Sequence, residues 1–191
     1  MHETVQELLA DLGVQPEYDN ATLQHLATAD SKYLRDLKMN VKSVLTSESL
    51  QAKESYLLAL AIATNNNNSV LINAFAEKAK ANEATDAEIA EAQACASLLA
   101  ANNVFYRFRH FVEKEFYTNA PARLRMNIMM NPVMGKEFFE LVSLVVSAVN
   151  GCEMCVKSHE QSVLHAGSSE QRIWDAIRLA SIITSLGKVV Y

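Results

Sequence analysis

Residues 135–160, GKEFFELVSLVVSAVNGCEMCVKSHE, contain two helix-forming segments separated by one break. The first segment, 135–149, is apolar and rich in valine, so a buried strand is an alternative on propensity alone. Its length and its flanking glutamates favour a buried helix. Gly151 suits a sharp bend, because glycine adopts backbone conformations that other residues avoid. We therefore expect a helical hairpin whose second helix begins at the pair Cys152 and Cys155.

The rest of the chain has the composition of an all-α protein. Its 191 residues include five glycines and three prolines, and alanine, leucine and glutamate are abundant. Few helix breakers and many helix formers favour an all-helical fold. In the first half of the chain we predict a helix at TVQELLADL that ends at Gly13, two helices within 20–45, and a helix that is capped at Ser47. After the NNNN break at 65–68 we predict a helix at SVLINAFAEKAKA, and then a helix that opens with a capping box at Thr85 and Glu88. The last predicted helix is the C-terminal SSEQRIWDAIRLASIITSL.

Charge and cysteine usage exclude several classes of function. The net charge of −5 and the isoelectric point of about 5.5 favour neither nucleic acid nor an anionic membrane as partner. The basic and aromatic run NNVFYRFRHF (102–111) is short and is better interpreted as a helical packing or subunit-contact segment. No secretory pattern opens the chain, and the apolar runs are far shorter than the ~20 residues of a membrane span. Three cysteines, an odd number, argue against a secreted disulfide framework, so we expect a cytoplasmic protein.

Two parts of the chain are weakly similar to each other. Sliding the sequence by 86 residues aligns 54–75 with 140–161, and a two-residue slip extends the alignment toward the C-terminus. We predict one domain over 1–191, with a degenerate repeat at about 47–104 and a second repeat at about 133–190. Coincidence between two alanine-rich helical hairpins is the alternative. At the aligned positions the first copy has neither thiol nor imidazole, so we expect the chemistry in the second copy.

Cys152, Cys155 and His159 share one face of the second predicted helix of the hairpin. The two cysteines are three residues apart, and the histidine follows four residues after the second. At a helix N-terminus, free N–H groups and the positive end of the helix dipole favour a thiolate. His159 lies one turn further on, where it is placed to accept the proton of Cys155 or, once protonated, to stabilise its thiolate. The pattern predicts a dithiol with a neighbouring base.

The preceding predicted helix carries a polar stripe. Glu140, Ser143 and Ser147 recur at three- and four-residue spacing on an otherwise apolar helix. If the hairpin folds back on itself, Ser147 lies opposite the second cysteine and Ser143 opposite the histidine. Glu140 is then within reach of the histidine, directly or through a water. A carboxylate there orients the imidazole and raises its basicity.

Other uses of these residues compete with a redox dithiol. A structural zinc site needs four ligands, and without a second Cys-x-x-Cys it would need Glu140 as a ligand. A c-type haem needs histidine directly after the second cysteine, where Val156 stands. A thioredoxin-like site would lie in a βαβ pattern, which is not predicted, and a pair of structural cysteines would leave the upstream acid unexplained. A redox dithiol without bound metal or cofactor is favoured, with zinc and a structural pair as alternatives.

The segment FELVSLVVSAVNGCEMCVKSHEQSVLHAG (139–167) resembles the active-site signature of the alkyl hydroperoxidase D (AhpD) family, within the carboxymuconolactone decarboxylase-like superfamily. That family has a glutamate twelve residues before a Cys-x-x-Cys and a histidine four residues after the second cysteine. The residues that match this spacing are Glu140, Cys152, Cys155 and His159. The resemblance extends to NNVFYRFRHF, LRMNIMMNP and LKMNVKSVL, and so covers most of the chain.

The resemblance implies an all-helical duplicated fold, a homotrimer, and a lipoyl-dependent alkyl hydroperoxide reductase (peroxidase) activity. It implies that Cys155 attacks the peroxide and becomes a sulfenic acid, and that Cys152 supplies a proton and closes the Cys152–Cys155 disulfide. Cys152, expected nearer the surface, would exchange with partner disulfides, and Glu140 and His159 would form the proton relay. The implied partners are the peroxiredoxin AhpC, a lipoylated dehydrogenase-complex subunit and dihydrolipoamide dehydrogenase, with dihydrolipoamide as electron donor.

One position departs from the family pattern. A family member has a second histidine directly before the second cysteine, where this chain has Met154. Methionine cannot transfer a proton, so a redox adaptor that reduces a peroxiredoxin without itself reducing peroxide is an alternative function. A decarboxylase or hydrolase on the same scaffold is a further alternative, although it would not need the thiol pair. Outside the signature, we expect Cys95 in the core and Trp174 as a helix-packing anchor.

Overall fold

The structure is a computed structural model and describes residues 3–191. Every regular element in that range is helical, which confirms the predicted all-α fold. The elements are α1 (Glu3–Leu12), α2 (Ala21–Thr28), α3 (Lys32–Leu45), α4 (Ala52–Asn65), α5 (Ser69–Ala81), α6 (Asp86–Val112), α7 (Glu115–Asn119), the 3₁₀ turn η1 (Asn127–Met129), α8 (Lys136–Val149), α9 (Glu153–His165) and α10 (Glu170–Leu186).

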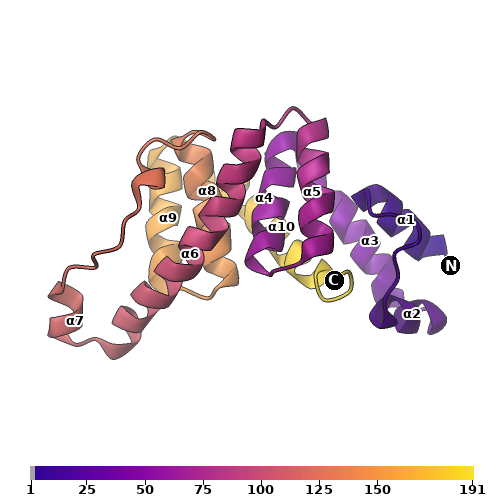
Figure 1. The fold of residues 1–191 in the computed structure, drawn as a ribbon, viewed down its shortest axis with the longest axis horizontal. Coiled ribbons are helices and arrows are strands. Elements are labelled where there is room, and N and C mark those ends of the chain that lie inside the picture. Colours follow the sequence, from indigo (N-terminus) through magenta and orange to yellow (C-terminus); the bar gives the residue numbers. More distant parts are fainter. Residues whose placement is uncertain (1–2) are drawn as a thin grey trace.

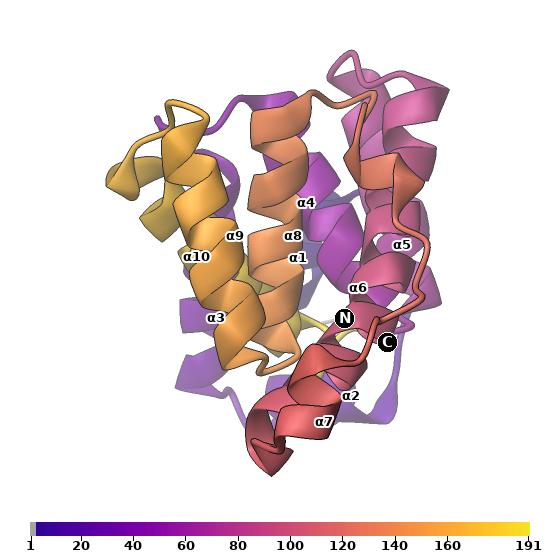
Figure 2. The same cartoon turned by 90° about the vertical axis from the view of Figure 1, so that its left-hand side faces the viewer.

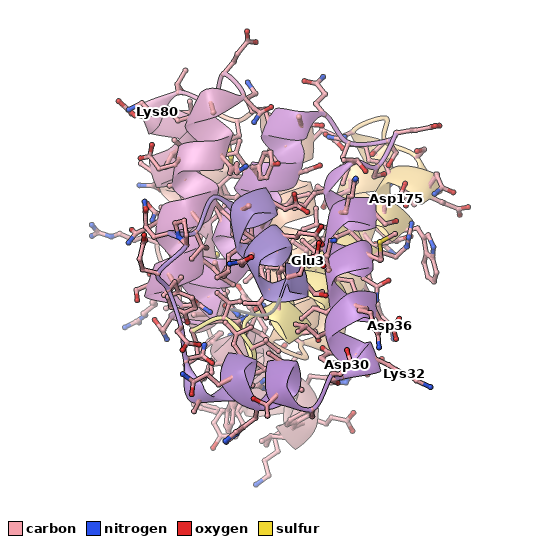
Figure 3. The ribbon with its side chains drawn as sticks, turned by 90° about the vertical axis from the view of Figure 1, so that its right-hand side faces the viewer. Glu3, Asp30, Lys32, Asp36, Lys80 and Asp175 are labelled. Atoms are coloured by element: carbon pink, nitrogen blue, oxygen red, sulfur yellow. A yellow bond between two sulfur atoms is a disulfide. The ribbon has the colours of Figure 1, made fainter. Side chains whose placement is uncertain are left out.

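The helices form an elongated bundle (Figure 1). Helices α4, α5, α8, α9 and α10 and the first part of α6 make its centre, while α1, α2 and α3 lie at the end far from α9. The second part of α6 leaves the bundle and carries α7 with it. Figure 3 shows the α1–α3 end, where charged side chains such as Lys32 and Asp36 lie at the surface. Among residues 3–191, no helix has both the length and the apolar character needed to cross a membrane.

Helix α8 is the most enclosed part of the bundle. Its residues 138–147 are all buried, and it contacts α4, α6, α9 and α10. Figure 2 shows α8 with α9 and α10 on one side and α6 on the other. A helix that is buried on every face is a core helix, so the valine-rich run is a buried helix and the alternative of a strand is wrong. Each large apolar side chain buried there stabilises the fold by about 1.5–3 kcal/mol.

The helix bounds repeat at an interval of 84 residues. The bounds of α8 (136–149) and α9 (153–165) are those of α4 (52–65) and α5 (69–81) plus 84, and the first residues of α6 and α10 differ by the same number. The hairpin turns are also alike, because Asn67 and Gly151 have φ angles of 54° and 68°. The structural interval is therefore 84 rather than the expected 86. It pairs Glu140 with Tyr56, and not with Glu54.

The capping signals predict the start of α6 but not the start of α4. At α6, Thr85 and Glu88 each accept a hydrogen bond from the other's backbone N–H, as a capping box requires. The predicted cap at Ser47 is wrong, because α4 begins at Ala52. The cap of α4 is Gln51, whose N–H donates to the carboxylate of Glu54 at 2.9 Å. In the segment before it, the Ser49 hydroxyl donates to Asp175 at 2.7 Å.

Two side chains outside the signature were predicted to pack in the core. Cys95 is fully buried, which confirms the prediction for that residue. Trp174 is 63 % exposed, so the prediction of a packing anchor is wrong. The buried face of α10 is made by smaller residues, including Ala176, Leu179 and Ala180.

Candidate functional site

The turn between α8 and α9 places Cys152 at the N-cap of α9. The Gly151 N–H donates to the carbonyl of Ala148 and the Cys152 N–H to that of Ser147, each at 3.1 Å. These two bonds are those of a Schellman turn, which needs a left-handed residue at the glycine position. Gly151 meets that need at no steric cost. The predicted bend is confirmed, and it fixes both cysteines at the start of the helix.

Amide side chains from α4 and α6 bond to the turn between α8 and α9. Asn150 exchanges hydrogen bonds with Asn65 at 2.9 and 3.1 Å and donates to Asn103 at 2.9 Å. Arg107 donates to the backbone carbonyl of Asn150 at 2.5 Å. Amide groups paired in this way away from bulk water hold one another in place, because breaking one bond leaves an unpaired polar group. The turn before Cys152 is therefore fixed by α4 and α6 as well as by its own backbone.

The two serines of the α8 stripe face α6 rather than α9. Asn103 donates to the hydroxyl of Ser147 at 2.9 Å, and the hydroxyl of Ser143 lies 3.4 Å from the sulfur of Cys95. Ser143 also donates to the carbonyl of Phe139 at 2.8 Å. The expectation that these serines lie opposite the second cysteine and the histidine is wrong. A helix buried on all sides has a neighbour on every face, and here the hydroxyl groups of the two serines meet α6.

Cys152 and Cys155 form a disulfide, so the structure describes the oxidised dithiol. Cys152 is 0 % exposed, whereas Cys155 is 6 % exposed and lines a cavity. The expectation that Cys152 is nearer the surface is therefore wrong for this state. Cys155 is the sulfur that a molecule in the cavity would meet.

Glu140 of α8 and His159 of α9 are hydrogen-bonded at 2.7 Å between Oε2 and Nδ1. The other carboxylate oxygen of Glu140 pairs with the ammonium group of Lys136 at 2.8 Å, one helical turn away. An ionised carboxylate only accepts hydrogen bonds, so Nδ1 of His159 carries a proton. In the neutral ring, Nε2 is then the basic nitrogen. The contact gives the direct orientation of the imidazole that the sequence predicts.

Glu140 is 5 % exposed and yet is held in its charged form. Burial opposes its ionisation, but the hydrogen bonds from His159 and Lys136 outweigh burial and lower the pKa of Glu140 below its ordinary value. Burial acts in the same direction at Cys95, but there no ion pair outweighs it, and it raises the thiol pKa to about 12. Cys95 is therefore a neutral core thiol, while the carboxylate beside His159 stays charged.

The cavity beside the disulfide has a volume of about 360 Å³. Its walls come from α6, α9 and the segment between α7 and α8, and most of them are apolar. The lining residues are Leu99, Asn102, Tyr106, Met126, Met129, Met154, Cys155, Ser158 and His159. Cys155 and His159 thus share one wall of a chamber large enough for a small organic molecule.

Two charged side chains hold the segment that covers this cavity. The carboxylate of Glu91 accepts hydrogen bonds from the backbone N–H groups of Val133 and Met134 at 2.8 and 2.7 Å. Lys136 donates to the carbonyl of Met129 at 2.9 Å while it pairs with Glu140. The segment is therefore bonded to α6 through Glu91 and to α8 through Lys136.

Within residues 3–191, no three His, Cys, Asp or Glu side chains are grouped so as to hold a metal ion.

Sequence comparisons show which family this site belongs to. Residues 117–190 match the model of the carboxymuconolactone decarboxylase family. The alkyl hydroperoxide reductase AhpD of Anaeromyxobacter sp. (strain K) is 43 % identical over 85 % of this chain and 87 % of that protein. The chain belongs to the AhpD family. AhpD proteins of Rhodopseudomonas palustris (strain BisA53) and Coxiella burnetii (strain Dugway 5J108-111) are 41 % and 40 % identical and are covered over 91 % and 90 % of their lengths.

In this AhpD-family chain the four signature residues gather at one place on the α8–α9 hairpin. Sequence reasoning missed Lys136, although its position four residues before Glu140 on one helix is a signal for an ion pair. It also missed Asn102, which enters the cavity from α6. No local pattern marks Asn102, because its place in the cavity depends on how α6 packs against α9.

Proposed function

We propose that this AhpD-family protein is a thiol peroxidase and disulfide reductase that uses Cys152 and Cys155 to reduce organic hydroperoxides. One observation carries the proposal. Cys155 lines an apolar cavity together with His159, and the ionised Glu140 binds the far nitrogen of that histidine. The names of the similar proteins, alkyl hydroperoxide reductase AhpD, support the same activity.

In the reduced protein, Nε2 of His159 takes the proton of the Cys155 thiol. Glu140 stabilises the resulting imidazolium, because its carboxylate is charged and hydrogen-bonded to Nδ1. The thiolate attacks the terminal oxygen of a hydroperoxide, so that a sulfur–oxygen bond forms and the oxygen–oxygen bond breaks. Sulfur loses two electrons and becomes Cys155–SOH. The alkoxide takes one proton from the relay and leaves as an alcohol.

Cys152 resolves the sulfenic acid. Its thiol sulfur attacks the sulfur of Cys155–SOH, water leaves, and the disulfide seen in the structure forms. The fixed turn at Gly151 brings the two sulfurs within bonding range without a change in the helix. Cys152 is at the N-cap of α9, where the helix dipole stabilises a thiolate when the disulfide is reduced again.

A dithiol such as dihydrolipoamide is the proposed electron donor. Its thiolate would attack Cys155, the sulfur that faces the cavity, and release Cys152. The lipoylated dehydrogenase-complex subunit and dihydrolipoamide dehydrogenase would supply these electrons. The reduced protein would in turn reduce the disulfide of oxidised AhpC, so that the thiols of this peroxiredoxin are regenerated and the Cys152–Cys155 disulfide forms. Exchange through Cys155 replaces the earlier expectation of exchange through Cys152, since Cys152 is fully buried in the oxidised form.

A redox adaptor is the second candidate, and Met154 favours it. Met154 lines the cavity next to Cys155, at the position of the second histidine of the family pattern, and cannot transfer a proton. Such a protein would exchange disulfides with AhpC but react slowly with peroxide.

A homotrimer is part of the proposal. Four apolar side chains on the projecting part of α6 and on α7 are strongly exposed, as subunit contacts are in an isolated chain. They are Val104, Phe108, Phe111 and Phe116. Light scattering on the purified protein tests this, and a monomer at micromolar concentration would contradict it.

Single-turnover kinetics test the proposed function. Reduced protein is mixed with excess tert-butyl hydroperoxide, and the loss of thiols is followed. We expect oxidation at least a hundred times faster than that of free cysteine at the same pH, and its loss in Cys155→Ser. Oxidation no faster than free cysteine, with rapid reduction of oxidised AhpC, would support the adaptor instead.

A further inference from the structure

Asn102 is a buried amide in the cavity wall with an unpaired oxygen. Asn102 is 5 % exposed, and its Oδ1 has no hydrogen-bond partner among residues 3–191. Its amide nitrogen donates to the thioether sulfur of Met126 at 3.1 Å, and a thioether is a weak acceptor. The neighbouring Asn103 is different, because both ends of its amide are bonded. Asn102 is therefore an amide held in an apolar wall with almost none of its hydrogen-bonding capacity used.

An unpaired buried amide lowers the stability of the fold unless a molecule in the cavity binds it. Buried polar groups in folded proteins are nearly always paired, and leucine at this position would fill the wall with no polar atom to satisfy. The terminal torsion of asparagine is soft, and methionine is adaptable. The carboxamide of Asn102 can therefore turn its oxygen toward the cavity past Met126 without movement of α6.

We propose that Asn102 binds the hydroperoxide by accepting its O–H hydrogen, and so directs the terminal peroxide oxygen toward Cys155. This rests on the proposed peroxidase function. The acceptor suits the chemistry, because a hydroperoxide has one hydrogen-bond donor, and it is on the oxygen that the thiolate attacks. That hydrogen stays on the oxygen throughout and ends in Cys155–SOH. The proton for the leaving alkoxide comes from the relay through His159, so Asn102 positions the substrate and transfers no proton.

Asn102→Leu tests this proposal through two reactions of the same sulfur. The first is single-turnover oxidation by tert-butyl hydroperoxide, and the second is alkylation of Cys155 by iodoacetamide, which has no O–H group. We expect the peroxide reaction to slow about tenfold or more and the alkylation rate to change less than twofold. The melting temperature should not fall, because the variant removes an unpaired polar group. Ser55→Ala is the matched control: the Ser55 hydroxyl is also buried and unpaired within the described chain, but it lies outside the cavity, and its loss should change neither rate.

Equal slowing of both reactions, or no change in either, would overturn the role of Asn102. If the reduced wild-type protein reacts with the peroxide no faster than free cysteine, the peroxidase function fails and this proposal fails with it. If Asn102→Leu does not fold, the side-chain amide signals of Asn102 are followed by NMR in Cys155→Ser during titration with tert-butyl hydroperoxide. A saturable shift is expected, and its absence would also overturn the proposal.

Discussion

The hairpins α4–α5 and α8–α9 have the same helix bounds at an interval of 84 residues but differ in the side chains of the dithiol and its proton relay. The counterparts of Lys136, Glu140, Cys155 and His159 are Ala52, Tyr56, Leu71 and Phe75. Leu71 and Phe75 are almost fully buried. The same hairpin backbone therefore forms without the dithiol. In α4–α5, apolar packing takes the place of the polar relay.

The position of Cys152 shows the difference most directly. Its counterpart, Asn68, is also an N-cap, and its side chain accepts a hydrogen bond from the Leu71 N–H at 3.0 Å. In the α8–α9 hairpin that cap is missing, and the capping residue is bonded to Cys155 instead. A cap contributes about 1 kcal/mol to stability, so the dithiol replaces a stabilising contact. The difference shows that this turn is structural in one hairpin and is available for chemistry in the other.

The largest effect on the reaction with peroxide is expected when a residue of the α8–α9 hairpin is replaced by its counterpart in α4–α5. Cys155→Leu copies the counterpart Leu71, and it should abolish peroxide-dependent thiol oxidation, a loss of at least about a thousandfold, because the attacking sulfur is gone. Single-turnover mixing measures it. Cys95→Ala is the control, since that neutral core thiol lies outside the cavity and its loss should leave the rate unchanged. Retained turnover in Cys155→Leu would show that the chemistry lies elsewhere.

A smaller effect is expected from the carboxylate of the relay. Glu140→Gln keeps the shape but removes the charge that stabilises the imidazolium of His159. We expect the pKa of the Cys155 thiol to rise and its rate with peroxide at pH 7 to fall about 10- to 100-fold. The pH dependence of alkylation by iodoacetamide gives the thiol pKa. Tyr56→Phe, at the counterpart position in α4, should change neither value. An unchanged pKa in Glu140→Gln would rule out a relay through Glu140.

Local signals in the sequence predict the helices and place Glu140 within reach of His159, directly or through a water, and the structure has the direct contact. Spacing on one helix fixes which residues share a face, and Gly151 fixes where the chain turns, so the hairpin follows from local rules. The same rules misplace Ser143 and Ser147. A stripe on a helix buried on all sides does not say which neighbour it meets, and α6 takes these two serines.

What the sequence cannot supply is the packing between distant segments. Ser49, in the segment before α4, bonds to Asp175 far along the chain, and α4 itself begins only at the cap formed by Gln51 and Glu54, so the local signal at Ser47 is misleading. The place of Asn102 in the cavity depends on the packing of α6 against α9. Pairs of this kind join residues far apart in the sequence, and no periodicity marks them.

Ion pairs also differ between the two halves of the repeat, α4–α6 and α8–α10. We expect this difference to affect the free energy of unfolding. Lys53 pairs with Glu88 at 2.8 Å, and the counterparts Glu137 and Arg172 pair at 3.0 Å with the charges exchanged. Arg172 also binds Glu54 of the other half at 2.7 Å. We expect Arg172→Met to lower the free energy of unfolding by about 2 kcal/mol, because it leaves two half-buried carboxylates without their partner. Lys53→Met should cost less than about 1 kcal/mol. Urea unfolding measures both, and equal losses would mean that Arg172 does not link the halves.

The smallest effect is expected from a pair of buried acids, and it depends on pH. Asp175 of α10 binds Ser49, in the segment before α4, and its counterpart Glu91 of α6 binds Val133, in the segment before α8. Each acid thus ties the third helix of one half to the entry of the other. Burial opposes ionisation of Asp175, but hydrogen bonds from Ser49 and Gln171 outweigh it and lower its pKa to about 2.

A depressed pKa fixes the sign of the pH dependence. In the unfolded chain an aspartate titrates near 3.9, so Asp175 stabilises the fold above about pH 4, and this contribution is lost as the pH falls toward 2. We expect Asp175→Asn to lower the free energy of unfolding by about 1 kcal/mol at pH 7 and to have little effect near pH 2. Urea unfolding at both pH values measures this, with Asp36→Asn, a surface acid of α3, as the control. A deficit of the same size at both pH values would show that the side chain acts through its shape, and that its charge does not hold the segment before α4.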